Sequence, residues 1–130
     1  MTWTKPTRII RSPGPAFTPS IEVADGGTIG VTYYDFRNNT KAAGLLSDYW
    51  LVHCHPRADC RRRSRWSETH VAGPFDMEKA PVASGYFLGD YQGLGSVGSS
   101  FQCLFAEART SHNPSAVFFT TVSPEALAAA

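Results

Sequence analysis

Short runs of apolar and aromatic residues, separated by turn-forming residues, extend along most of the chain. Seven of these runs have the length and composition of β-strands, and no strong amphipathic helix precedes the C-terminal tail. The predicted strands are 17–24, 28–36, 48–55, 66–71, 86–91, 101–108 and 116–122. This pattern predicts an all-β fold rather than alternating strands and helices.

Turn and cysteine positions refine this prediction. Asp25-Gly26-Gly27 separates the first two predicted strands, and residues that tolerate positive φ at this point predict a tight hairpin. Cys54 and Cys60 flank a short polar loop. A disulfide between them would add about 2 kcal/mol in an oxidising compartment, and two free thiols are the alternative. Cys103 lies inside an apolar run and is predicted to be a buried core residue.

A weak internal repeat organises the predicted strands. Trp3–Ile9 aligns with Trp66–Val71 at an offset of 63 positions, and both segments lead through a proline-containing loop toward a further strand. Repeats of this length suggest one four-stranded sheet per repeat, the unit of a propeller blade. Strands such as 29–34 and 101–105 are apolar on both faces, as stacked blades require. A small β-sandwich is the alternative.

Four longer segments resemble the C-terminal part of bacterial sialidase-like proteins with BNR (Asp-box) repeats: 16–21, 30–37, 48–54 and 85–94. The resemblance covers nearly the whole chain. Trp3 and Trp66 are similar to the last residue of the Asp-box, S-x-D-x-G-x-x-W, but the rest of the box is absent from both positions.

The resemblance implies a six-bladed β-propeller, of which this chain supplies an incomplete ring of about two four-stranded antiparallel blades. Residues 1–11 would end one blade, 16–71 would form a whole blade and 80–123 would give three strands of the next, before a frayed tail at 124–130. Missing blades or self-association would be needed to close the ring. The resemblance also implies a secreted protein, although the N-terminus as given has no apolar run typical of a signal peptide.

The function implied by the resemblance is that of an exo-α-sialidase-type glycoside hydrolase acting on terminal sialic acids of glycans, without a cofactor. We expect the isolated fragment to be inactive. One alternative is a non-catalytic propeller that binds glycans through aromatic residues such as Trp50, Tyr86 and Tyr91. The other is a scaffold fragment with no activity of its own.

In propellers of this kind, ligands bind at a face formed by loops from one end of the blades. The segments 11–17, 35–48, 75–86 and 109–115 are expected at that face. A sialidase needs arginines for the substrate carboxylate, a tyrosine nucleophile with a carboxylate base, and an acid/base aspartate. The candidate catalytic residues are Asp90, Tyr91 and Glu107, and the candidate substrate-binding residues are Asp35, Arg37, Asp76, Tyr86 and Arg109.

Two pairs within this set have a structural alternative. Asp35 and Arg37 are two residues apart, as are Glu107 and Arg109, so each pair projects to one side of a strand. An ion pair or a turn cap is therefore the favoured interpretation of Asp35 and Arg37, and an ion pair is favoured for Glu107 and Arg109.

The net charge and two further groups of residues argue against several classes of partner. The net charge of +1 gives no reason to expect nucleic acid or a membrane surface. Five side chains are of the types that bind zinc: His53, Cys54, His55, Cys60 and His70. No zinc site is predicted, because their spacing matches no familiar zinc finger and strand alternation points His53 and His55 away from Cys54. An arginine run could contact phosphate, but a solvated loop is favoured; it comprises Arg57, Arg61, Arg62, Arg63 and Arg65.

Overall fold

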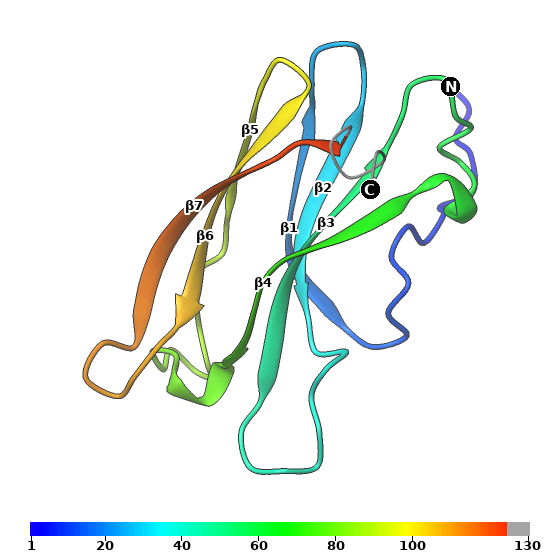
Figure 1. Cartoon of the computed structure of the whole chain (residues 1–130). Coiled ribbons are helices and arrows are strands. Elements are labelled where there is room, and N and C mark those ends of the chain that lie inside the picture. The colour runs from blue at the N-terminus through cyan, green and yellow to red at the C-terminus, as the bar shows by residue number, and fades with distance from the viewer. Residues whose placement is uncertain (125–130) are drawn as a thin grey trace.

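The structure, a computed structural model, describes residues 1–124, which form two antiparallel sheets (Figure 1). The first sheet contains β1 (Ala16–Val23), β2 (Ile29–Asp35), β3 (Leu46–Cys54) and β4 (Ser67–Asp76) in that order. The second contains β5 (Gly93–Val97), β6 (Ser100–Ala108) and β7 (Ser115–Val122). Two single-turn 3₁₀ helices, η1 (Arg63–Arg65) and η2 (Met77–Lys79), flank β4. The predicted all-β fold is confirmed, whereas residues 125–130 of the predicted frayed tail lie outside the described part.

Local sequence explains the hairpin between β1 and β2. Gly26 and Gly27 have φ of 83° and 87°, a region that side chains disfavour. Their conformation lets the Ala24 amide donate to the Thr28 carbonyl at 2.9 Å and the Gly27 amide donate to the Ala24 carbonyl at 3.0 Å. The hairpin predicted from Asp25-Gly26-Gly27 is therefore confirmed.

One predicted strand is wrong. Residues 86–91 are not a strand, and Tyr86 makes only an isolated bridge with Val82. Positive φ at Ser84, Gly85 and Gly89 interrupts the extended backbone here. The strand that pairs with β6 is instead the glycine-rich β5, which was not predicted because glycine is depleted in strands.

The N-terminal segment also differs from the expected end of a blade. Residues 1–15 contain no strand, and Pro6 lacks the N–H that a central strand position would need. The segment lies instead beside the loop between β3 and β4, where the Thr7 hydroxyl donates to the Arg61 carbonyl at 2.8 Å.

The two sheets pack face to face around an aromatic core. Tyr49 of β3 stacks on Phe105 of β6 with ring centroids 4.4 Å apart. The Tyr34 hydroxyl of β2 donates to the Ala106 carbonyl at 2.6 Å. Gly30 leaves space for the Phe101 ring, because a Cβ at this glycine would lie 2.5 Å from a ring carbon. The predicted burial of Cys103 is confirmed in the same core.

Both outer faces of this pair of sheets carry apolar side chains. On the first sheet, Ile21 is 67% exposed. On the second sheet, Val117 is 71% and Phe119 64% exposed. Antiparallel sheets of two-layer proteins are commonly polar on the solvent side, so the exposed apolar residues of the second sheet have the composition of a surface that another layer covers. On the first sheet, Ile9 and Ile10 of the N-terminal segment already pack on a buried cluster, and the large apolar residues left exposed lie on the edge strand β1.

Candidate functional site

The meander topology gathers the chain's longer loops at one end of the two sheets. Strands β2, β4 and β6 end there and β3 and β7 begin there, so the segments 36–45, 77–92 and 109–114 lie at this end (Figure 1). The loop between β3 and β4 lies at the opposite end with the two short hairpin turns. We call the first of these ends the loop end.

Arg37, just beyond β2, is held by two carboxylates on the outer face of the first sheet. Its guanidinium lies 2.8 Å from Asp35 Oδ2 and 2.9 Å from Glu68 Oε2. The guanidinium also stacks 3.8 Å from the centre of the Trp50 ring. The expected Asp35–Arg37 ion pair is therefore present, and Arg37 has few donors left for a ligand.

Tyr33 completes this cluster by donating from its hydroxyl to Glu68 Oε1 at 2.8 Å. Burial, together with the acceptor Glu68, raises the pKa of Tyr33 well above its ordinary value. Burial alone would also raise the pKa of Glu68, but hydrogen bonds from Arg37, the Arg11 amide and Tyr33 outweigh it and hold that pKa below the usual range. Tyr33 is thus a neutral phenol beside an ionised Glu68, an arrangement suited to structure rather than to nucleophilic attack.

A second polar group lies on the same face. Asp48 is fully buried, and its carboxylate lies 2.7 Å from His70 Nε2 and accepts from Asn38 Nδ2 at 3.0 Å. The His70 ring packs edge-on against Trp50 with centroids 4.8 Å apart. Sequence reasoning missed Glu68 as a partner of Arg37 and missed the pair of Asp48 with His70, because these contacts depend on the register of β3 and β4. The one available signal in the sequence was strand alternation, which places Glu68 and His70 on the same side of a strand.

Asp76 and Arg109 meet at a cavity between the two sheets at the loop end. The cavity has a volume of about 320 Å³ and is lined by Leu46, Pro74, Phe75, Asp76, Lys79, Ala108 and Arg109. Asp76 accepts from the Leu45 amide at 2.9 Å and from the Glu78 amide at 3.0 Å. The bond from Leu45, followed by that from Glu78, lowers the pKa of Asp76, so this residue is an ionised cap of η2 rather than a proton donor.

Arg109 is paired with Glu107, as its spacing predicted, but loosely. Arg109 Nη1 lies 3.4 Å from Glu107 Oε2, and the guanidinium lies 5.4 Å from the centre of the Phe118 ring. The Arg109 side chain is half exposed, whereas Glu107 is largely buried. With Lys79, Arg109 gives the cavity two cations beside the ionised Asp76, so the cavity lining carries a net charge of +1.

The remaining predicted residues lie elsewhere. Asp90, Tyr91 and Tyr86 are exposed on the connection between η2 and β5, and Tyr91 is 89% exposed. Tyr91 lines a shallow hollow with Leu104 and Val117 on the outer face of the second sheet. The structure thus separates Tyr91 from Glu107. Among the predicted residues it pairs Asp35 with Arg37 and Glu107 with Arg109, and it places Asp76 and Arg109 at one cavity.

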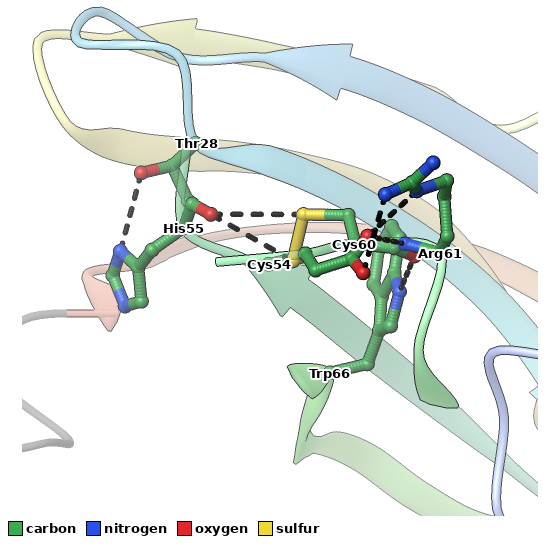
Figure 2. Close-up of a disulfide and its surroundings, with 7 residues drawn as sticks. Thr28, Cys54, His55, Cys60, Arg61 and Trp66 are labelled. Carbon is green, nitrogen blue, oxygen red and sulfur yellow. Dashed lines mark hydrogen bonds and ion pairs between the residues drawn. A yellow bond between two sulfur atoms is a disulfide. The ribbon is translucent and has the colours of Figure 1, made fainter. Parts of the chain in front are cut away.

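Cys54 and Cys60 form a disulfide at the opposite end, with Cα atoms 6.0 Å apart (Figure 2). Cys54 is therefore occupied, and residues 1–124 contain no group of three or more His, Cys, Asp or Glu side chains placed to hold a metal ion. Within the same residues no helix is long and apolar enough to cross a membrane.

Comparison of the chain with protein-family models, with curated proteins and with solved structures finds no match.

Proposed function

We propose that this chain is a section of a sialidase-like β-propeller glycoside hydrolase acting on terminal sialic acids of glycans. The first sheet is one blade and the second is three strands of the next. The observation that carries this proposal is the exposed apolar surface of the second sheet, at Val117 and Phe119, together with the exposed Ile21 on the edge strand of the first sheet. A propeller blade is covered on both faces, whereas the outer faces of a sandwich are solvated.

The loop end would be the glycan-binding face. The cavity between the blades presents Arg109 and Lys79, which suit the carboxylate of a sialic acid. Asp76 supports this wall by fixing the backbone of Leu45 and η2. Asp90, Tyr91 and Tyr86 are accessible at the same end and would reach a glycan only across the blade boundary.

The isolated chain is proposed to bind rather than to cleave. Asp90, Tyr91 and Glu107 do not converge, and Tyr33 is held as a neutral phenol. This arrangement also favours the second candidate, a non-catalytic glycan-binding propeller. The parent protein's activity distinguishes the two, since a hydrolase parent cleaves sialosides and a lectin parent only retains them.

The test combines binding and turnover. A fluorogenic sialoside measures hydrolysis, and titration with a sialylated trisaccharide, followed by NMR of the isotope-labelled chain, measures binding. We expect shifts at Arg109 and Lys79, no turnover, and loss of binding in Arg109→Gln but not in the control Lys41→Gln, which removes an exposed charge outside the cavity. Absence of shifts at the cavity, or equal loss in both variants, would contradict the proposal.

A further inference from the structure

The loop that joins β3 to β4 concentrates positive charge. Within residues 57–65 are five arginines and one acidic residue, Asp59, a net charge of +4. The whole chain carries only +1, so the rest of it is net negative. All five arginines are exposed: Arg57, Arg61, Arg62, Arg63 and Arg65. We call this segment the arginine loop.

The arginine loop is held in one conformation from several sides (Figure 2). The Cys54–Cys60 disulfide closes its first half. Trp66 is buried beneath the loop, and its ring N–H donates to the Cys60 carbonyl at 2.8 Å. Backbone turns add bonds from Ala58 to His55 and from Arg62 to Asp59, each 2.9 Å long. A ligand therefore meets arginines on a backbone that is already ordered, which lowers the entropy lost on binding.

The charge of the loop is only partly neutralised. Asp59 lies 2.8 Å from Arg61 and 3.5 Å from Arg62. Arg63 donates to the Arg11 carbonyl at 3.1 Å, a contact that leaves its charge uncompensated. Arg57 and Arg65 make no ion pair with any residue in 1–124. Several guanidinium groups thus stay available to an anion.

From these observations we propose that the arginine loop binds a sulfated polysaccharide. Guanidinium groups bind tetrahedral oxyanions through paired hydrogen bonds, and several sulfates in sequence match several arginines on a short loop. The disulfide suits an oxidising environment, where extracellular polysaccharides are the abundant polyanions. Sites for single-stranded nucleic acid combine positive charge with exposed aromatic rings for stacking, whereas the arginine loop contains no aromatic residue and the adjacent Trp66 is only 7% exposed.

This site lies at the end of the molecule opposite the cavity that contains Arg109, so it is separate from the proposed glycan-binding face (Figure 1). The polysaccharide would attach the protein to a surface while the loop end stays free. The inference therefore stands whether or not the proposed hydrolase function is correct.

The test uses heparin as the probe. The wild-type chain, the double variant Arg57→Gln/Arg65→Gln and the charge-matched control Lys41→Glu are eluted from immobilised heparin with a salt gradient. Isothermal titration at several salt concentrations then gives the salt dependence of the affinity. We expect retention above about 0.15 M salt. The loop variant should bind on the order of tenfold more weakly, with a log–log salt slope reduced by about two, and the control should be close to wild type.

Three results would overturn the proposal. Wild type passing through the column at about 0.15 M salt would mean that the loop has no useful affinity. Equal losses in the loop variant and in the control would mean that only net charge matters. Tighter binding to duplex DNA or to anionic lipid vesicles than to heparin would assign the loop to another polyanion. All three substituted side chains are exposed, and a thermal melt of each variant verifies that the fold is retained.

Discussion

At the scale of single residues, the outer face of the first sheet depends on a compact ionic cluster. Arg37 lies between Asp35 and Glu68 and against Trp50, and Tyr33 donates to Glu68. Buried charges are tolerated only when their hydrogen bonds are satisfied. Removal of one partner leaves the other charge buried and unpaired, at the full cost of its desolvation. The cluster therefore constrains where β4 lies relative to β2.

Glu68→Gln should lower the free energy of unfolding by about 2–4 kcal/mol at pH 7, because it leaves the Arg37 charge without one carboxylate. The folded pKa of Glu68 is depressed, so its stabilisation is complete above the unfolded value of about 4.3 and is lost as the pH falls through the folded pKa. Chemical denaturation from pH 7 to pH 3 should show the difference between wild type and variant shrinking at the acid end.

Glu78→Gln is the control for this prediction. Glu78 is exposed on η2, and its side chain makes no hydrogen bond with residues 1–124. We expect it to change stability by less than about 0.5 kcal/mol at any pH in the series. A Glu68 variant as stable as the Glu78 variant at pH 7 would refute the structural importance of the cluster.

The single free thiol gives another prediction at this scale. Burial raises the pKa of Cys103 to about 11, and Cys54 and Cys60 are joined in a disulfide. At pH 8 a disulfide-exchange reagent should not label the native chain and should label one thiol per chain in denaturant, since the thiolate is the reactive form. Reduction of the disulfide before denaturation should raise the number of labelled thiols to three per chain. Fast labelling of the native chain would contradict the burial of Cys103.

At the scale of elements, the sequence predicted strands best where apolar residues and turn residues coincided. The hairpin of β1 and β2 followed from Asp25-Gly26-Gly27, whereas β5 was missed because its partner β6, not its own composition, makes it a strand. The ion pair of Asp35 with Arg37 followed from a spacing of two residues. The contact of Arg37 with Glu68 did not, because it depends on pairing between strands that are distant in sequence.

The packing of the two sheets can be tested at Gly30. Gly30→Ala would place a Cβ 2.5 Å from the Phe101 ring, so one sheet must shift away from the other. We expect a loss of about 1–3 kcal/mol in the free energy of unfolding, typical of overpacking. Gly95→Ala is the matched control in β5, because a Cβ there meets nothing within 4 Å. Similar stabilities of the two variants in urea denaturation would argue against face-to-face contact at Phe101.

At the scale of the whole molecule, two sheets share one core while each keeps apolar residues on its outer face. This combination is the central reason to regard them as neighbouring blades. In the proposed parent, further blades would cover Ile21 on one side and Phe119 on the other. In the isolated chain the same surfaces are free to associate.

The most direct test of the propeller proposal is light scattering with size-exclusion chromatography on the purified chain across a range of concentrations. The proposal predicts self-association, with a trimer as the species whose six sheets would close a ring, and predicts that Phe119→Lys on the outer face of β7 shifts the chain toward monomer. The matched variant Thr121→Lys places a charge on the same face, farther along the strand, and should have the smaller effect. A wild-type chain that stays monomeric at every concentration and unfolds cooperatively would contradict the proposal, because its outer faces would then need no further blades.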